Sequence, residues 1–178
     1  MAIAESFGKY ARQSVLAGVV MRRDLVVDGF VFGRATIEGD DATDAIITMH
    51  RSLDRNDISC IMIDGQVISM FNIIDGQSVA EEAGLPVVAV TFEDSAGLEG
   101  AIRHRFPDSW PAKMEQYARI GGREKIVLRT GKALYARCWG MTNRRATVLL
   151  NAFTLQGVLP EPVRIAKRAA RAAANAFC

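Results

Sequence analysis

The chain has 178 residues, 49% of them hydrophobic and 24% charged, and a net charge of +2. This balance is typical of a globular protein with an ordinary buried core, and it excludes a disordered chain. No stretch approaches the roughly 20 apolar residues of a membrane span, and the sequence does not start with the pattern of a secretion signal. We therefore expect one cytoplasmic domain over residues 1–178 that has no membrane partner.

The first elements in chain order are predicted to be extended. Ala2–Glu5 is expected to be the end of a strand, and the abrupt start inside it raises the alternative that the beginning of this strand is missing. Ser14–Met21 and Leu25–Ile37 are rich in β-branched residues and are separated by a short polar turn. This pattern predicts an antiparallel hairpin, with Gly29 and Gly33 as the expected bulge positions.

A helix and a buried strand are predicted next. Asp40 or Asp41 offers an N-cap for an amphipathic helix over Ala42–Leu53, whose apolar residues recur at helical spacing. Ile58–Ile63 is a short apolar run, typical of a strand that is covered on both faces. This strand is expected to end at Asp64, which is followed by a glycine.

The rest of the chain predicts alternating helices and strands. A helix over Gln77–Ala83 and a strand over Leu85–Phe92 would complete a parallel crossover with the preceding buried strand. The further expected elements are a mostly helical region from Ala96 to Gly122, a hairpin of Lys125–Thr130 with Ala133–Cys138, and helices over Arg144–Phe153 and Pro162–Ala176. The whole predicts an α/β domain of three layers, in which an antiparallel hairpin is followed by parallel strands in a mixed sheet.

The cysteines give little functional signal. Cys60, Cys138 and Cys178 are odd in number and far apart, which excludes a CxxC redox pair or a zinc knuckle and favours a reducing cytosol. Cys60 lies in an apolar stretch, so we expect it to belong to the core. The two histidines, His50 and His104, have no neighbouring ligands and do not support a mechanism based on His.

The charges are divided unevenly along the chain. Residues 1–100 carry 7 Lys and Arg against 16 Asp and Glu, a net charge of −9, whereas residues 101–178 carry 15 against 4, a net charge of +11. An acidic centre facing a basic surface would suit metal-assisted chemistry on a polyanion. The alternative is that the two halves neutralise each other across the fold.

Acidic residues mark the candidate site. Asp64 follows a buried strand, and open α/β sheets bind their ligands at the carboxyl ends of such strands; the alternative is a simple Asp-Gly turn. Glu38, Asp40 and Asp41 crowd around one glycine. Carboxylates are ligands that Mg²⁺ prefers, although these acids would also favour the positive end of the following helix.

Basic residues recur at three- and four-residue spacing on the last predicted helix. They are Arg164, Lys167, Arg168 and Arg171. Side chains at this spacing share a helix face, which would suit contact with a phosphate backbone, or would simply be solvated. A Gly-rich phosphate loop and the motif of a serine nucleophile are both missing from the sequence.

Several segments resemble known families. Ile61–Gln66 (IMIDGQ) is similar to the strand and DGQG turn of endonuclease V, and Asn151–Lys167 (NAFTLQGVLPEPVRIAK) resembles its AFTLPG…IPEPTRLAH segment. Over nearly its whole length the chain is more closely similar to an uncharacterised archaeal endonuclease V-like family, a domain of unknown function. The motifs of that resemblance are Gly39–Thr43 (GDDAT), the IMIDG strand end, Phe71–Asp75 (FNIID), Gly84–Val87 (GLPV) and Leu159–Ala166 (LPEPVRIA).

This resemblance implies a ribonuclease-H-like fold and a metal site. In endonuclease V, carboxylates of the first strand, the third-strand region and the DGQG strand bind a divalent cation, Mg²⁺ or Mn²⁺, and a His near the start of the penultimate helix assists. Asp64 matches the DGQG aspartate. Asp41 is the best match to the second carboxylate, with Asp40 beside it as a further candidate ligand.

The same resemblance implies an incomplete catalytic set. Ala4 stands at the position of the first-strand aspartate, and the nearest acid, Glu5, would need a bulge or twist to reach Asp64. Trp139–Asn143 occupies the place of the assisting His, so standard two-metal catalysis is expected to be impaired.

The expected function is binding of nucleic acid, DNA or RNA, with weak or altered metal-dependent phosphodiesterase activity. In this prediction Asp64, Asp41 and Glu5 are the catalytic candidates, and Arg164 and Arg168 contact the nucleic acid together with Arg171. The alternative is a non-enzymatic binding or assembly protein that keeps the fold and has lost catalysis.

Overall fold

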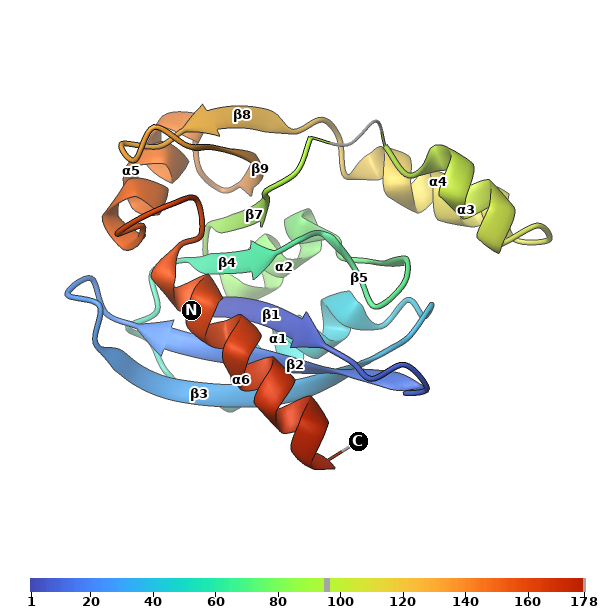
Figure 1. The fold of residues 1–178 in the computed structure, drawn as a ribbon, viewed down its shortest axis with the longest axis horizontal. Coiled ribbons are helices and arrows are strands. Elements are labelled where there is room, and N and C mark those ends of the chain that lie inside the picture. Colours follow the sequence, from blue (N-terminus) through green and yellow to red (C-terminus); the bar gives the residue numbers. More distant parts are fainter. Residues whose placement is uncertain (95–96, 178) are drawn as a thin grey trace.

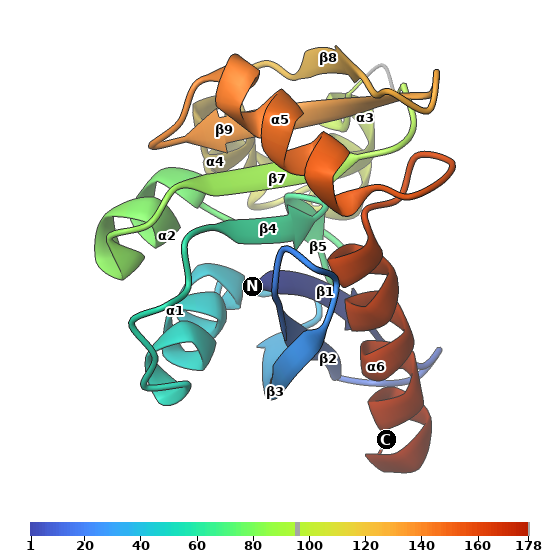
Figure 2. The ribbon, with the colours of Figure 1, turned by 90° about the vertical axis from the view of Figure 1, so that its left-hand side faces the viewer.

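A computed structural model describes residues 1–94 and 97–177. Its main sheet has seven strands: β1 (Ala2–Ser6), β2 (Gln13–Met21), β3 (Val27–Thr36), β4 (Ile61–Asp64), β7 (Val87–Thr91), β8 (Glu124–Val127) and β9 (Ala133–Trp139). Their order across the sheet is β3-β2-β1-β4-β7-β9-β8 (Figures 1 and 2). β1, β4 and β7 are parallel and the other neighbours are antiparallel, which confirms the predicted mixed sheet.

The N-terminal hairpin is close to the prediction. β2 and β3 pair in one register until a shift between Val20 and Met21, and Gly29 lies opposite Val20 at this bulge. The bulge predicted at Gly33 is wrong, because Gly33 pairs regularly with Leu16. A Cβ on Gly33 would lie 2.6 Å from Sδ of Met49, so a side chain at this position would have to displace the Met49 side chain.

Six helices are described. They are α1 (Ala42–Ser52), α2 (Gly76–Ala83), α3 (Glu99–Arg105), α4 (Trp110–Arg119), α5 (Asn143–Phe153) and α6 (Glu161–Phe177). α1 and α2 cover one face of the sheet and α5 and α6 the other, which gives the expected three layers, whereas α3 and α4 extend past the carboxyl end of β4 (Figure 1). The helical region was expected from Ala96, which lies outside the described residues.

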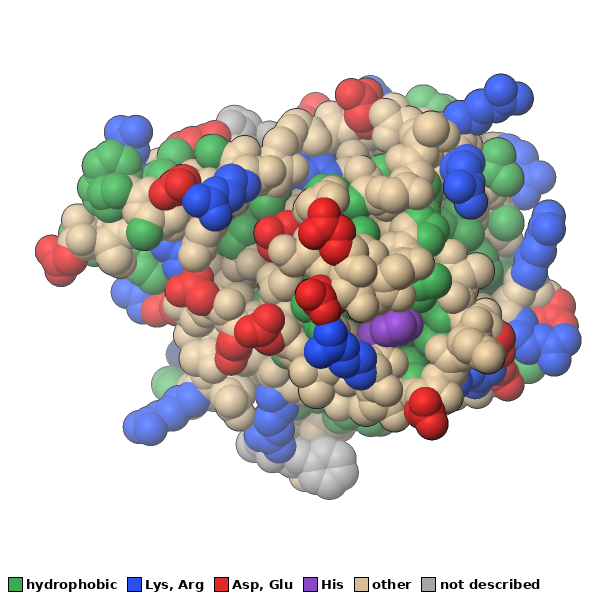
Figure 3. Space-filling view, turned by 180° about the vertical axis from the view of Figure 1, so that it is seen from behind, with side chains coloured by type: hydrophobic (Ala, Val, Ile, Leu, Met, Phe, Trp, Pro, Cys, Tyr) green, Lys and Arg blue, Asp and Glu red, His purple; other side chains and the backbone are tan. Residues whose placement is uncertain are grey.

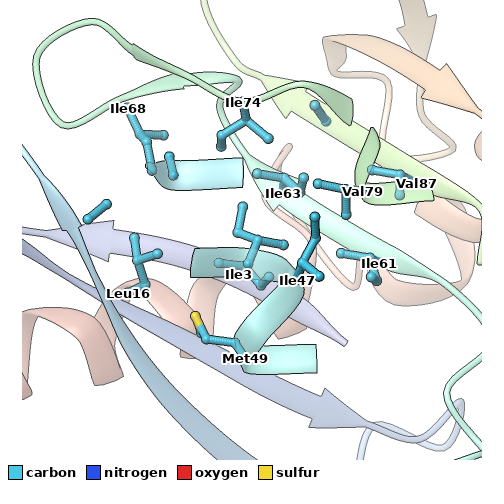
Figure 4. Close-up of a cluster of buried hydrophobic side chains, with 14 residues drawn as sticks. Ile3, Leu16, Ile47, Met49, Ile61, Ile63, Ile68, Ile74, Val79 and Val87 are labelled. Carbon is cyan, nitrogen blue, oxygen red and sulfur yellow. The ribbon is translucent and has the colours of Figure 1, made fainter. Parts of the chain in front are cut away.

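Alternating side chains of the strands divide the core into two parts. Ile3 of β1 and Ile61 and Ile63 of β4 pack under α1 and α2 (Figure 4). Ala2 and Met62 face the opposite layer. This alternation follows from the two-residue period of a strand, and it decides which face each residue at the end of a strand points to.

The strand predicted from Ile58 begins at Ile61, and a small hairpin of β5 (Val67–Ile68) and β6 (Asn72–Ile73) was not predicted. Cys60 is partly buried against the core, and burial raises the pKa of its thiol to about 11. Cys178 lies outside the described residues.

The helices of residues 1–94 and 97–177 include none that is long and apolar enough to cross a membrane.

Candidate functional site

The candidate site lies where β1 and β4 end. The two strands pair with Ala2 opposite Met62 and Ile3 opposite Ile63, so the next residues along them are Ala4 and Asp64. Because strand side chains alternate, Ala4 and Asp64 point to the face that α6 covers. Asp64 thus ends a central parallel strand, between β1 and β7, as the sequence predicted.

Asp64 is paired with a lysine of α6. Nζ of Lys167 donates to Oδ2 of Asp64 at 2.6 Å, and the Asp64 side chain is only 11% exposed. Ala4 is buried against Val19 and Ala166. Small side chains at positions 4 and 166 therefore let α6 approach β1 closely and bring the next residue, Lys167, over the carboxylate.

Glu5 points away from Asp64. The pairing of β1 with β2 runs from Ala2 to Ser6 without a shift, so β1 has no bulge that would turn Glu5 towards α6. Its carboxylate accepts hydrogen bonds from the backbone N–H and the hydroxyl of Ser69, at 2.7 and 2.6 Å. Glu5 therefore supports the turn after β5, and its catalytic role stays a prediction.

The turn that Glu5 supports has an uncommon backbone. Ser69, Met70 and Phe71 all have positive φ angles, of 45°, 54° and 75°, which costs residues with a Cβ about 1–2 kcal/mol each. Surrounding groups hold the turn in place, since the backbone N–H of Glu38 donates to the Ser69 carbonyl at 2.7 Å. Met70, in the middle of this turn, is exposed.

Asp41 lies at the N-cap of α1, but its carboxylate does not cap the helix. It accepts hydrogen bonds from the backbone N–H and hydroxyl of Thr36 and from the side-chain amide of Asn72, at 2.6–3.1 Å. Burial would raise the pKa of Asp41, but these hydrogen bonds outweigh it, so the pKa lies below its ordinary value. The carboxylate joins β3 to β6, which explains the position of Asp41 without a metal.

Asp40 and Glu38 form ion pairs with basic side chains from the second half of the chain. Asp40 accepts from Nζ of Lys113 at 2.5 Å, and Glu38 accepts two hydrogen bonds from Arg105, at 2.5 and 2.8 Å. On the face shown in Figure 3, basic and acidic side chains lie among each other and neither sign covers the face alone. These pairs, with that of Asp64, favour the alternative in which the two halves neutralise each other.

The donor set around Asp64 does not fit a divalent cation in the arrangement that the resemblance implies. The neighbouring strand contributes a methyl group from Ala4, and the cationic partner of Asp64 is an ammonium group. Within residues 1–94 and 97–177, no group of three or more His, Cys, Asp or Glu side chains is arranged to hold a metal ion. Metal binding by Asp64, Asp41 and Asp40 stays a prediction.

The predicted basic face of α6 divides into different roles. Arg164 is half-buried, 3.2 Å from Glu161, and donates to the Leu159 carbonyl, so its contacts stabilise the start of the helix. Arg168 and Arg171 are exposed. Nucleic-acid binding by all three stays a prediction.

The sequence did not single out Lys167 as a partner of Asp64. A signal was present, because the quoted family segment IPEPTRLAH ends in His where this chain has Lys167. The resemblance placed the assisting His at Trp139–Asn143 instead. In the structure the ring of Trp139 lies against Gly76, next to α2.

A pocket of the structure lies apart from Asp64. It has a volume of about 630 Å³ and is lined by residues at the start of β1 and β4, including Met1, Cys60 and Met62, and by apolar residues of α5. Asp64 is at the other end of β4 and does not line it.

The chain is similar to one family model and to UPF0215 proteins of archaea. The model of a family described as Endonuclease dU matches residues 1–174. A UPF0215 protein of Pyrobaculum calidifontis is 39% identical over 168 residues, which cover 94% of this chain and 92% of that protein. A UPF0215 protein of Thermococcus kodakarensis is 32% identical over 162 residues, 90% of this chain and 81% of that protein.

Solved structures are similar in fold. A protein of unknown function from Archaeoglobus fulgidus has a TM-score of 0.80 at 30% identity, with 96% of this chain and 95% of that chain covered. Endonuclease V of Ciona intestinalis, in complex with a DNA that contains an inosine followed by a ribo-adenosine, has a TM-score of 0.64 at 11% identity, with 99% and 85% covered. The human endonuclease V has a TM-score of 0.65 at 15% identity, with 98% and 83% covered. The predicted ribonuclease-H-like fold is thereby confirmed.

Proposed function

Because the chain belongs to the Endonuclease dU family, an endonuclease V-like family with archaeal members, we propose that it binds nucleic acid and has weak or altered metal-dependent phosphodiesterase activity. The observation that carries this proposal is the position of Asp64, at the carboxyl end of a central parallel strand, where α/β sheets bind their ligands. Arg168 and Arg171 extend a cationic surface from the adjacent Lys167 along α6. A cytoplasmic location, expected from the sequence, is part of the same proposal.

Nucleic acid is the proposed partner because of the proteins that share this fold. The solved Ciona endonuclease V holds an inosine-containing DNA, and the family description refers to dU. DNA containing deoxyuridine or inosine is therefore the first substrate class to test, beside ordinary DNA and RNA. Weak activity follows from the residues at the site, since a phosphodiesterase metal needs several fixed oxygen ligands and Ala4 supplies none.

The experiment is a binding and cleavage screen of the wild-type protein with these nucleic acids, in Mg²⁺, in Mn²⁺ and in EDTA. We expect measurable binding at low salt and slow cleavage that requires the metal and is lost in Asp64→Asn, which keeps the size of the side chain. Efficient cleavage that Asp64→Asn leaves unchanged would place the active site elsewhere. Failure to bind any of these nucleic acids at low salt would overturn the proposal.

A non-enzymatic binding protein is the second candidate. The observation in its favour is the ion pair of Asp64 with Lys167, which neutralises the acid that catalysis would need. This candidate predicts the same binding in Mg²⁺ and in EDTA, with no cleavage products under any condition of the screen.

The basic surface of α6 gives a separate prediction. Replacing both Arg168 and Arg171 with Glu is expected to weaken the binding of all nucleic-acid sequences. The slope of log affinity against log salt concentration should become shallower by about 2, because each lost phosphate contact removes about one released counterion. Salt titrations by fluorescence anisotropy measure this slope. Thermal stability should change little, since both side chains are exposed.

The matched control reverses the same charge at another place. Arg22 and Arg23 lie in the turn between β2 and β3, at the opposite end of β2 from the site, and both are exposed. Replacing both with Glu should leave the salt slope near that of the wild type. An equal loss in both double variants would mean that net charge alone governs binding.

A further inference from the structure

We propose that Lys167 takes the place of a divalent cation at Asp64, so that this site carries a fixed cation of the protein and binds Mg²⁺ only weakly. The inference rests on the proposed function, because it explains why cleavage would be weak at an otherwise well-placed acid.

Lys167 contacts Asp64 directly. The ammonium group of Lys167 lies 2.6 Å from Oδ2 of Asp64, the carboxylate is mostly buried, and the lysine side chain is 47% exposed. A cation that bound Asp64 from the α6 side would have to displace this ammonium group or lie beside it. A metal ion and an ammonium group at the same carboxylate repel each other, and this repulsion is strongest where water is partly excluded.

The charges around Asp64 leave little attraction for a divalent cation. With Ala4 on the neighbouring strand, Asp64 is the acid that these two strand ends present to α6, and one ammonium group neutralises it. The carboxylates of Glu5 and Asp41 do not replace the acid that is missing at position 4. Ser69 donates hydrogen bonds to Glu5, and Thr36 and Asn72 donate hydrogen bonds to Asp41. A divalent cation would therefore meet a site of nearly zero charge with few oxygen ligands.

Ala4 and Lys167 are linked through the packing of α6 on β1. Ala4 and Ala166 are both buried and pack against each other between β1 and α6. Their small size sets the distance at which α6 lies from β1, and this distance brings Lys167 within reach of Asp64. The alanine at position 4 and the lysine at position 167 are thus parts of one arrangement.

Binding of Mn²⁺ in the absence of nucleic acid tests the inference, by titration calorimetry or by the electron paramagnetic resonance of free Mn²⁺. Lys167→Met keeps the aliphatic stem, removes the charge and should fold, because the residue is partly exposed. We expect this variant to bind Mn²⁺ about tenfold more tightly than the wild type, since a charge next to the ligand is lost. Adding Ala4→Asp should strengthen binding further, and adding Asp64→Asn should abolish the gain.

The control is Arg168→Met, which removes a cation from the neighbouring position on α6 without a contact to Asp64. It should leave Mn²⁺ binding unchanged. If Ala4→Asp unfolds the protein, the Lys167→Met and Lys167→Met/Asp64→Asn variants still decide the question. Equal affinity of wild type and Lys167→Met for Mn²⁺, or tight binding by the wild type, would overturn the inference.

These outcomes are distinguishable from failure of the proposed function. The metal titration needs no nucleic acid, so a protein that binds no DNA or RNA could still gain Mn²⁺ affinity in Lys167→Met. Conversely, nucleic-acid binding by the wild type in EDTA would stand even if that variant gained none.

Discussion

Replacing Lys113 with methionine is expected to lower the free energy of unfolding by about 3 kcal/mol, because three partly buried acceptors lose their donor. Lys113 belongs to α4 and is only 6% exposed. Its ammonium group donates to the carbonyls of Gly39 and Phe71, at 2.8 and 3.1 Å, and to the carboxylate of Asp40. One side chain thus joins α4 to the turn before α1 and to the strained turn after β5.

Urea unfolding measures the total effect and hydrogen exchange locates it. Protection in α3 and α4 should fall more than in the central strands, since Lys113 is a main link of these helices to the rest of the fold. Lys125→Met is the matched control, because Lys125 is exposed on β8, and its effect should stay within about 0.5 kcal/mol. Equal decreases in the free energy of unfolding of the two variants would show that the hydrogen bonds of Lys113 do not stabilise the fold.

Replacing Gly76 with alanine is expected to destabilise the protein by about 1–3 kcal/mol, as overpacking does in a core. A Cβ at Gly76 would lie 2.4–2.6 Å from three ring carbons of Trp139. The ring is rigid and packs against the core under α2, so α2 or β9 would have to move. Thermal and urea unfolding of the variant measure the loss.

Gly100→Ala should stabilise the protein, in contrast to Gly76→Ala. Gly100 lies inside α3, where an added Cβ would meet no atom within 4 Å. Alanine in a helix should therefore stabilise this position by about 0.5–1 kcal/mol, because glycine loses more backbone freedom on folding. If both variants lost stability, the contact of position 76 with Trp139 would not explain the destabilisation by Gly76→Ala.

The sequence predicted the elements of the sheet and the helices because their signals are local. Alternating or continuous runs of β-branched residues identified β2, β3 and β4, and helical spacing identified α1 and α6. The small hairpin of β5 and β6 was missed, since each strand has two residues and the turn between them requires positive φ at residues that disfavour it.

The position of Asp64 was also determined by the sequence. A carboxylate that directly follows a buried strand lies at the carboxyl end of that strand, and the predicted parallel crossover places this end at the edge where α/β sheets bind their ligands. The family segments at Ile61–Gln66 and Asn151–Lys167 pointed to the same fold, and the comparisons agree with it.

Only the tertiary structure decided what each polar residue of the site contacts. Lys167 is 103 residues from Asp64 in the chain, and Ser69 is 64 residues from Glu5. No local pattern encodes such pairs, because they depend on how closely α6 lies on β1 and on the turn that follows β5. The sequence thus specified an acid at the end of β4, while the packing of two alanines, Ala4 against Ala166, determined that this acid is paired with a lysine.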